Sequence, residues 1–430
     1  MTEEFLVPNE NLDAANYIVV DLKSFYASVE CVERGLDPFT TNLVVADPDR
    51  EKGTICLAIT PAMKALGIKN RCRVYEIPPN VDYIMATPRM QLYIEYSANI
   101  YEIYLKYFSK DDIHVYSIDE SFVDCTNYKN LYHMTAKEMG IRLINDIYET
   151  TGITATLGVG SNLYLAKIAL DITAKHAKDH VGVLTEESYQ KLLWHHKPMT
   201  DFWRIGPGTE KRLRNHGIYD MKDITIANED SLYKMFGIDA ELIIDHAWGK
   251  ETTTMQDIKN YKPKGTSLSS GQVLLRDYEY EEAKLIVKEM LDLLCFDLVD
   301  KDLITDSISL YVGYSHLWEI PGSGGTISLM SPTSSAIVMR PQVISLYEKI
   351  VYRNIPIRRV CINFNRVMDE AYRQYDLFTD PEELEKERKI QKAMVEIKDR
   401  FGKNSILKGM NLEKAGTTME RNMQIGGHKS

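Results

Sequence analysis

The chain has 430 residues, of which 44% are hydrophobic and 26% charged, and its formal net charge at pH 7 is −11. This length exceeds what one ordinary hydrophobic core supports, so two to four domains are expected. No apolar stretch is long enough for a membrane span and the Met-Thr-Glu-Glu start lacks the features of a secretion signal, so a cytoplasmic protein without membrane partners is expected.

The cysteine spacing and the net negative charge limit which bonds, metal sites and partners are expected. The six cysteines lie far apart without a Cys-x-x-Cys pair, which is typical of reduced cytosolic thiols and excludes an obvious zinc site or disulfide framework. The excess of negative charge argues against tight unaided binding to nucleic acid, because such binding depends on Lys and Arg meeting phosphates. A metal-binding cluster of carboxylates would itself contribute to that charge.

The first third of the chain alternates short strands with helices. An apolar strand over 17–21 ends at Asp21, and the pattern after it predicts a helix. Proline directly after Thr60 suits the first position of another helix. The aromatic stripe of the following long helix is expected to pack in the core. The expected elements are strand 17–21, helix 24–33, strands 43–46 and 53–58, a helix from Thr60 to near Gly67, and helix 91–108.

The segment Tyr116-Ser-Ile-Asp-Glu-Ser121 carries the most chemical information. It predicts the tip of a β-hairpin over 113–125, with Asp119 and Glu120 adjacent at the tip. Together with Asp21, these carboxylates could hold two divalent cations roughly 3.5–4 Å apart, which is the arrangement that serves in-line phosphoryl displacement. Taken alone, an acidic hairpin tip is more often a solvated turn.

Three further elements complete this region: helix 136–150, strand 154–159 and helix 162–174. Strands with intervening helices, carboxylates at strand ends and no parallel βαβ regularity indicate an α+β domain.

From about Glu186 the pattern changes to short helices with tight turns. A Gly206-Pro-Gly208 turn opens a basic helix that contains Lys211. Exposed backbone N–H groups in such a turn can hold a phosphate without reading a base. An ordinary helix N-terminus is the alternative for the glycines alone, but the flanking apolar helices favour a helix-hairpin-helix that grips a DNA backbone.

The last part of the chain begins with a polar, aperiodic stretch over 249–264 that is expected to be a linker. It is followed by a β-α-β-β-α-β pattern, which predicts a split-βαβ sheet with helices on one face. The other face is expected to carry polar residues that suit a duplex. A charged helix from Pro381 to about Arg400 and a mildly basic end follow. The polar residues expected on the open face are Ser307, Ser309, Tyr311, Arg359 and Asn363.

Three motifs in this order make the chain resemble the Y-family, or translesion, DNA polymerases, and most of all their UmuC-like bacterial branch. They are Val20-Asp-Leu-Lys-Ser-Phe-Tyr-Ala-Ser-Val-Glu30, Tyr-Ser-Ile-Asp-Glu-Ser, and Leu157-Gly-Val-Gly-Ser-Asn-Leu-Tyr-Leu-Ala-Lys167. The resemblance covers roughly residues 16–378. It implies a right-hand α+β polymerase: a palm over 14–185 with small fingers inserted at about 25–84, a helix-hairpin-helix thumb over 186–248, a linker over 249–264, a split-βαβ little finger over 265–378 and a tail over 379–430.

The resemblance also implies a template-directed, error-prone polymerase that copies past damaged bases without proofreading. Two Mg²⁺ ions, which Mn²⁺ can replace, would be held by Asp21, Asp119 and Glu120 and by the backbone carbonyl of Leu22. The ions would activate the primer 3′-hydroxyl and neutralise the departing pyrophosphate.

The nucleotide site follows from the same resemblance, with two departures. Phe25 and Tyr26 fall where the family contacts the nucleotide sugar, and Tyr26 would exclude a ribose 2′-hydroxyl. Where many relatives have a Tyr and a cation on the fingers helix, this chain has Thr60 and Met63, with Lys64 one position later. Lys175 resembles the palm lysine that holds the phosphates, although it lies one residue farther from Lys167 than in many relatives.

Partners follow as well: primer-template DNA, dNTPs, the bacterial sliding clamp, and a recombinase or accessory subunits. Gln374, Leu377 and Phe378 resemble the short peptide with which bacterial polymerases bind the clamp, although five residues can match by chance. A clamp tether would offset the unfavourable charge, because effective concentration can replace intrinsic affinity. Two other classes stay open: another two-metal enzyme such as a nuclease or nucleotidyl cyclase, and a catalytically silent clamp- or DNA-binding scaffold.

Overall fold

The structure is a computed structural model, and it describes residues 15–50, 53–175, 177–263, 266–370 and 380–430. The chain forms two compact units, unit 1 over Met1–Tyr261 and unit 2 over Lys262–Ser430. Among the described helices, none combines the length and the apolar character that crossing a membrane requires.

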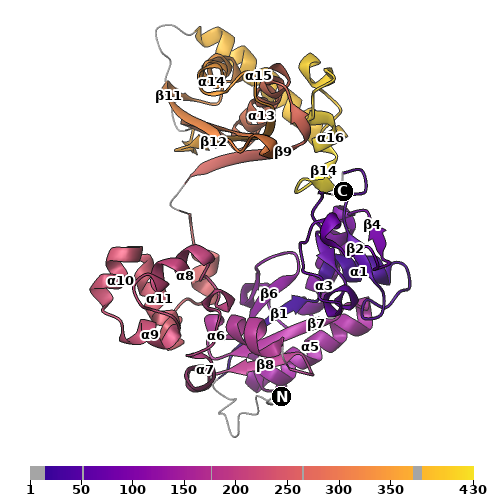
Figure 1. Cartoon of the computed structure of the whole chain (residues 1–430), viewed down its shortest axis with the longest axis vertical. Coiled ribbons are helices and arrows are strands. Elements are labelled where there is room, and N and C mark those ends of the chain that lie inside the picture. The colour runs from indigo at the N-terminus through magenta and orange to yellow at the C-terminus, as the bar shows by residue number, and fades with distance from the viewer. Residues whose placement is uncertain (1–14, 51–52, 176, 264–265, 371–379) are drawn as a thin grey trace. The chain divides into compact units, whose positions relative to one another are not determined.

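Unit 1 is built on a five-stranded sheet with the order β5-β6-β1-β7-β8 (Figure 1). The central strand β1 pairs antiparallel with both β6 and β7, and its Ile18, Val19 and Val20 are fully buried. β8 runs parallel to β7, so this region contains one parallel βαβ unit within an otherwise antiparallel sheet, which agrees with the absence of a regular βαβ series in the sequence. The strands are β1 (Tyr17–Leu22), β5 (Ile113–Val115), β6 (Glu120–Asp124), β7 (Ala155–Gly160) and β8 (Val181–Leu184).

Helix α6 (Leu163–Ile168) packs directly on β7 because β7 contains glycines at the contact. A Cβ atom on Gly158 would lie 2.2 Å from the carbonyl oxygen of Ala166, and one on Gly160 would lie 2.2 Å from the Ala166 nitrogen. Any other residue would push the helix away from the sheet. The Leu-Gly-Val-Gly motif therefore fixes where the side chains of α6 lie.

The helix expected over 162–174 is an α-helix only in its first half. Its second half, η4 (Ala169–Ala174), is a π-helix. A π-turn accommodates one extra residue without breaking the helix. This matches the one-residue longer offset between Lys167 and Lys175.

A small α/β insert follows β1. Its three-stranded sheet has the order β3-β2-β4, and its own core includes Val44, Ile59 and Met63. Strand 53–58 was expected here, but only β3 forms, and Ile55 makes a single bridge with Arg73. β4, which the sequence did not indicate, pairs parallel with β2. The elements are α1 (Phe25–Val32), β2 (Leu43–Val45), β3 (Ala58–Ile59), α2 (Pro61–Ala65), η2 (Val74–Glu76) and β4 (Ile84–Ala86).

The remaining helices of unit 1 surround the sheet and form a helical end. α8, α9, α10 and α11 share one hydrophobic core with α6 and α7. The helices are α3 (Met90–Leu105), η3 (Lys110–Asp112), α4 (Tyr128–Tyr132), α5 (Ala136–Thr151), α7 (Glu186–Leu193), η5 (Met199–Asp201), α8 (Pro207–Arg214), α9 (Met221–Ile226), α10 (Glu229–Phe236), α11 (Asp239–Trp248) and α12 (Met255–Asn260).

The α12 helix corrects the expectation of an aperiodic linker over 249–264. Thr254 and Asp257 form a capping box at its start, and Met255 is buried in the core of unit 1. The Lys259 ammonium donates hydrogen bonds to the carbonyls of Lys110 and Ile113, at 3.1 and 2.6 Å. Most of the expected linker is therefore a fixed part of unit 1.

Unit 2 contains a four-stranded antiparallel sheet with the order β11-β10-β12-β9. α13 and α14 cover one face and bury a large apolar core there. This is the split-βαβ arrangement expected from the pattern. The elements are β9 (Ser267–Tyr278), α13 (Tyr280–Asp300), β10 (Leu303–Tyr314), η6 (His316–Trp318), β11 (Ser323–Thr333), α14 (Ala336–Ile350), β12 (Ile357–Asn365) and β13 (Met368–Asp369).

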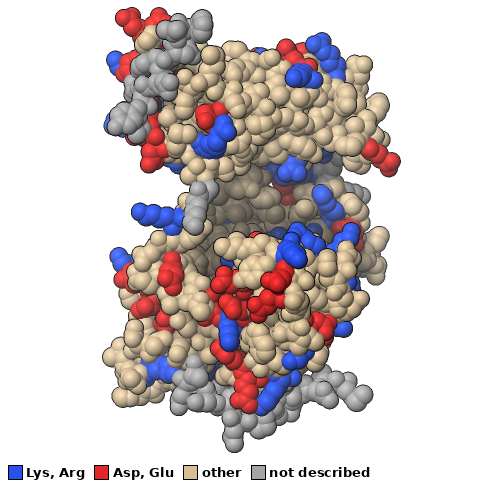
Figure 2. Space-filling model, turned by 90° about the vertical axis from the view of Figure 1, so that its left-hand side faces the viewer, with Lys and Arg blue, Asp and Glu red and all other residues tan. Residues whose placement is uncertain are grey.

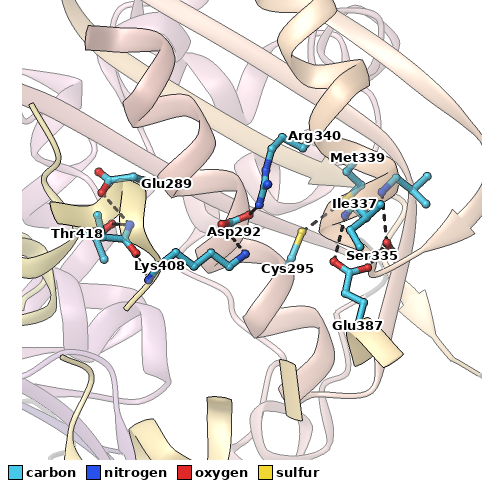
Figure 3. Close-up of polar contacts among 12 residues, drawn as sticks. Glu289, Asp292, Cys295, Ser335, Ile337, Met339, Arg340, Glu387, Lys408 and Thr418 are labelled. Atoms are coloured by element: carbon cyan, nitrogen blue, oxygen red, sulfur yellow. Dashed lines mark hydrogen bonds and ion pairs between the residues drawn. The ribbon is translucent and has the colours of Figure 1, made fainter. Parts of the chain in front are cut away.

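The last fifty residues fold onto the helical side of unit 2. Figure 3 shows Glu289 and Asp292 of α13 facing this tail. Glu289 accepts hydrogen bonds from the Asn411 amide and the Thr417 backbone N–H, each at 2.8 Å, and Asp292 pairs with Lys408 at 2.7 Å. The tail contains α15 (Pro381–Phe401), η7 (Gly409–Leu412), α16 (Thr418–Asn422), β14 (Gln424–Ile425) and β15 (His428–Lys429).

Candidate active site at the end of strand β1

Three carboxylate residues meet where β1 ends. Asp21 lies directly opposite Glu120 in the antiparallel pairing of β1 with β6. One residue later, the Leu22 N–H donates a 2.9 Å hydrogen bond to the carbonyl of Asp119. Pairing of the main chain therefore places Asp21, Asp119 and Glu120 together, as the sequence predicted for this edge.

The hairpin tip is held by local hydrogen bonds. The Glu120 carbonyl accepts the N–H groups of Tyr116 and Ser117, at 3.0 and 3.1 Å. The Ser117 hydroxyl donates to the Asp119 carboxylate at 2.6 Å. Ser97 of α3 donates to the Ile118 carbonyl at 2.7 Å, which connects the tip to a long helix. Asp119 thus sits on a constrained turn.

The local electrostatics favour a cation. Burial, and then the charges of Asp119 and Glu120, raise the pKa of Asp21 to about 7. Burial also raises the pKa of Glu120, although Lys167 opposes the shift. For Lys167, burial would lower the pKa, but the charges of Asp171 and Glu120 outweigh it and raise the pKa overall. Asp21 and Glu120 therefore ionise less readily than free carboxyls, and a bound cation would favour their charged forms.

The donor set fits Mg²⁺, which prefers carboxylate and carbonyl oxygens. As the side chains stand, no three His, Cys, Asp or Glu residues in the described ranges converge closely enough to enclose a metal ion. At Glu120, the Lys167 ammonium lies 2.9 Å from each carboxylate oxygen. The three carboxylate residues are of the right kind for Mg²⁺, and their backbones bring them together. Glu120 is already paired with the Lys167 ammonium.

The two aromatic residues after Asp21 differ in environment. Phe25 is 2% exposed and belongs to the core, so its side chain is not available to a ligand. Tyr26 is partly exposed and stacks on Tyr93. Burial and the charge of Asp119 raise the pKa of Tyr26, which locates its phenol near the carboxylates. Tyr26 is therefore the one of the pair that borders the site.

Thr60 does not border the site. Its hydroxyl donates to the Thr41 carbonyl at 2.8 Å and accepts from the Met63 N–H at the start of α2, and the residue is fully buried. Met63 is buried as well. The expected contact of Thr60 with a nucleotide is thus corrected: its hydroxyl is used to cap α2.

Lysines gather beside Asp21. Burial lowers the pKa of Lys64, with Asp21 opposing and Lys175 adding to the shift, so Lys64 faces both residues. Burial and the charge of Lys64 lower the pKa of Lys23 to about 8. Lys175 lies 3.8 Å from Asp171 at the end of the π-helix. Lys64 is therefore close enough to Asp21 and Lys175 for their charges to influence its pKa.

Sequence reasoning did not assign roles to Lys23, Arg71 or Lys167. Arg71 lies close enough to Tyr26 to lower its pKa against the effect of burial. The i,i+4 spacing of Lys167 and Asp171 was a readable signal, since such pairs meet on a helix. Lys23 lay inside the first motif, two residues after Asp21, and was passed over.

The expected DNA contacts lie on exposed surfaces. Gly206 precedes the first turn of α8 and Gly208 lies in it, and a Cβ atom on either would meet nothing within 4 Å. Lys211 is exposed, whereas Arg212 donates to the Met235 carbonyl at 2.9 Å and connects α8 to α10. On the visible face of the lower body in Figure 2, acidic side chains gather near the centre and basic ones toward one edge.

The open face of the unit 2 sheet is polar and hydrogen-bonded across its strands. Ser269 donates to Asn363 at 2.5 Å, Asn365 donates to Ser309 at 2.9 Å, and Ser309 bonds Thr326 at 2.8 Å. Arg359 is exposed on β12. These side chains offer neutral hydroxyl and amide groups and little positive charge.

The expected clamp-binding residues, Gln374, Leu377 and Phe378, lie outside the described residues.

Comparison with known proteins gives a consistent result. The model of the impB/mucB/samB family matches residues 20–171, and the model of that family's C-terminal domain matches residues 266–377. The chain is 31% identical to the putative UV-damage repair protein UvrX of Bacillus subtilis (strain 168), over 96% of this chain and 98% of that protein. It is 30% identical to DNA polymerase IV 2 of the same strain, over 95% of this chain and 98% of that protein.

Among solved structures, a Y-family DNA polymerase chimera of Dbh and Dpo4 superposes with a TM-score of 0.63 at 22% identity, over 82% of this chain and 99% of the other. This likeness confirms the α+β fold that the sequence predicted.

Proposed function

This chain belongs to the impB/mucB/samB family of Y-family DNA polymerases, and from this premise we propose that it extends a DNA primer past damaged template bases, without proofreading, by a two-metal-ion reaction. The observation that supports the reaction best is the pairing of Asp21 with Glu120 beside Asp119.

The metal ions would be held by Asp21, Asp119 and Glu120, with the Leu22 carbonyl beside them. When bound, they would lower the pKa of the primer 3′-hydroxyl and neutralise charge on the departing pyrophosphate. The protein's own part is to fix these oxygens on paired strands. A carboxylate placed by β-pairing loses little freedom when it binds, and this placement is the positioning effect on which such catalysis relies.

The cations beside Asp21 suit a triphosphate. Lys23, Lys64 and Lys175 come from three different elements and influence one another or Asp21 electrostatically. We assign Lys64 and Lys175 to the nucleotide phosphates, with Lys23 as an added neighbour. Thr60 has no part in this assignment, because its hydroxyl caps α2.

Selection of the sugar is assigned to Tyr26. Its ring borders the carboxylates and is supported from behind by Tyr93. A rigid ring at this place would collide with a 2′-hydroxyl and so favour dNTPs over rNTPs. Phe25 would support α1 from the core.

DNA contacts are assigned to neutral and basic groups on each unit. Gly206 and Gly208 expose backbone N–H groups at the start of α8, with Lys211 one turn later. In unit 2, Arg359 and the hydrogen-bonded polar row would meet the duplex backbone. Because positive charge is sparse on that sheet, a clamp tether through Gln374, Leu377 and Phe378 is part of the proposal.

The decisive test is primer extension by the full chain with Mg²⁺, dNTPs and a primed template, including a template with an abasic site. Asp119→Asn should abolish extension while DNA binding, measured by fluorescence anisotropy, stays within about twofold. Asp124→Asn, at the opposite end of β6, is the matched control and should extend normally. Unchanged extension by Asp119→Asn would refute the metal assignment, and a wild type that binds DNA without extending it would favour a silent scaffold.

A further inference from the structure

Lys167 occupies an unusual position between two carboxylates. It lies on α6, which the glycines of β7 hold against the sheet, and it is only 8% exposed. Its ammonium lies 2.9 Å from both oxygens of Glu120 and 3.1 and 3.2 Å from the two oxygens of Asp171. One buried cation is thus shared by a residue of the candidate metal site and a residue outside it.

We propose that Lys167 is a positioning residue that holds Glu120 while the metal site is empty and passes to Asp171 when a divalent cation binds Glu120. The proposal rests on the function proposed above, since it concerns the same carboxylates.

Exchange is required by geometry. An ammonium 2.9 Å from both oxygens of Glu120 competes with a metal ion for that carboxylate, because two cations at such short range repel each other strongly. Lys167 must therefore withdraw from at least one oxygen before Glu120 can ligate an ion. A buried lysine that withdraws into an apolar environment would lose its ion pair without compensation, which is strongly unfavourable.

Asp171 makes that withdrawal possible. It lies one helical turn beyond Lys167, at the i,i+4 spacing that brings side chains together, and already contacts the ammonium. Passing from Glu120 to Asp171 therefore requires a small rotation of the Lys167 side chain and leaves its charge paired throughout. A lysine with Glu120 as its only acceptor would instead oppose metal binding without relief.

The movement of Lys167 would also affect Lys175, at the end of the π-helix. Asp171 also pairs with Lys175, at the longer distance of 3.8 Å. As Lys167 moves fully onto Asp171, the attraction between Asp171 and Lys175 is weakened by the nearer cation. Lys175 is then freer to turn to a phosphate, so that occupation of the metal site and readiness for the triphosphate are linked.

The proposal is tested by titrating Mn²⁺ into the full chain without DNA or nucleotide and measuring free Mn²⁺ by electron paramagnetic resonance. Lys167→Met keeps an unbranched side chain of similar length and removes the charge, so Mn²⁺ should bind roughly tenfold more tightly. Lys167→Arg should bind within about threefold of wild type, because the charge is retained. Lys191→Met is the matched control, as it removes an exposed lysine that pairs with Glu187, and should leave affinity unchanged.

A double-mutant cycle separates exchange from a general field effect. Asp171→Asn removes the alternative acceptor, so Mn²⁺ should bind more weakly than to wild type. The charge of Asp171 also acts directly on Asp21 and Glu120. Exchange therefore predicts that Asp171→Asn weakens Mn²⁺ binding less in the Lys167→Met background than in the wild type. Additive effects of the two substitutions, or weaker binding by Lys167→Met with its thermal melt intact, would overturn the proposal.

The Mn²⁺ titration also distinguishes failure of the metal assignment from failure of the exchange. If wild type binds Mn²⁺ no better than Asp119→Asn does, the carboxylates are not a metal site and both proposals fall. If wild type binds and Asp119→Asn does not, but Lys167→Met leaves the affinity unchanged, only the exchange falls.

Discussion

The ring of Tyr26 stacks on the ring of Tyr93, with centroids 4.5 Å apart and planes within 15° of parallel. Tyr93 is itself fixed, because its hydroxyl donates a 2.7 Å hydrogen bond to Glu30. Glu30 in turn accepts two hydrogen bonds from the Arg89 guanidinium, at 2.9 and 2.7 Å. The ring of Tyr26 is therefore supported on one face by Tyr93, which is itself held by hydrogen-bonded side chains.

This support predicts how sugar selection responds to substitution. Tyr26→Ala should raise the frequency of ribonucleotide incorporation by about tenfold or more, because removing the ring opens the space that a 2′-hydroxyl would need. Tyr26→Phe keeps the ring and should preserve selectivity. Single-nucleotide extension with paired dNTP and rNTP measures both. Equal sugar preference in Tyr26→Ala and wild type would remove Tyr26 from this role.

The clamp motif predicts a separable defect. Replacing Leu377 and Phe378 together by Ala should abolish the stimulation of synthesis by the bacterial sliding clamp, because the two apolar side chains would fill a pocket on the clamp. Synthesis without the clamp should stay at the wild-type rate, which serves as the internal control. The measurement is primer extension on a primed circular template with and without loaded clamp. Retained stimulation would exclude these residues as the docking peptide.

Attachment of the tail predicts a stability effect at Glu289. Glu289→Gln keeps the shape of the side chain but replaces one carboxylate oxygen by an NH₂ group. That NH₂ group would face the N–H donors of Asn411 and Thr417, which need an acceptor. The loss should be about 1–3 kcal/mol in the free energy of unfolding of unit 2. Urea unfolding followed by fluorescence measures it. Glu281→Gln, exposed on the same helix, is the control, and an equal effect in both would show that the tail contact is not stabilising.

The lowered pKa of Glu251 predicts how the stability of unit 1 changes at acid pH. Burial alone would raise the pKa of Glu251, but hydrogen bonds from His246 and Thr253 outweigh it and lower the pKa to about 2. A carboxyl whose folded pKa lies below its unfolded value of 4.5 stabilises the fold above pH 4.5. That contribution is lost as the pH falls from there toward 2.

Glu251→Gln should therefore lower the stability of unit 1 by roughly 2 kcal/mol at pH 7 and by much less at pH 3. Thermal melts at the two pH values, compared with the wild type, measure the difference. Glu187→Gln, an exposed residue of α7, is the matched control. A loss of equal size at both pH values would show that the charge of Glu251 is not what stabilises this region.

The sequence predicted the elements whose signals are strong and local. A continuous apolar run marked β1 and alternation marked the 113–125 hairpin. Once two antiparallel strands are identified, the residues at their paired ends follow. That is why Asp21, Asp119 and Glu120 could be placed together without a structure. The four strands of the unit 2 sheet and the helices α13, α14 and α15 were readable for a similar reason, since each is long, whereas the short elements of unit 2 were not expected.

What could not be predicted depends on tertiary contacts. β3 and β4 are two and three residues long, too short for a period, and form because β2 pairs with both. The π-helix over Ala169–Ala174 continues a helical sequence pattern, and helix propensity does not distinguish a π-turn from an α-turn. α12 is polar and short, and it is a helix because Met255 packs against unit 1.

The site residues divide in the same way. Backbone pairing placed the carboxylates, whereas the direction of Lys64 and the burial of Thr60 depend on how α2 packs on its small core. Lys167 pairs with both Glu120 and Asp171. The pairing with Asp171 could be predicted from the i,i+4 spacing on a helix, whereas the pairing with Glu120 depends on the packing of α6 against the sheet.

The attachment of the last fifty residues bears on how unit 2 can be studied in isolation. The match to the model of the family's C-terminal domain ends at residue 377, and a recombinant fragment trimmed there would keep every strand of the sheet. It would also leave Glu289 and Asp292 without Thr417, Asn411 and Lys408, and strip the cover from one side of α13. A fragment intended for crystallisation or for spectroscopy of the isolated unit should therefore extend to Ser430, and purification tags are better placed before Lys262.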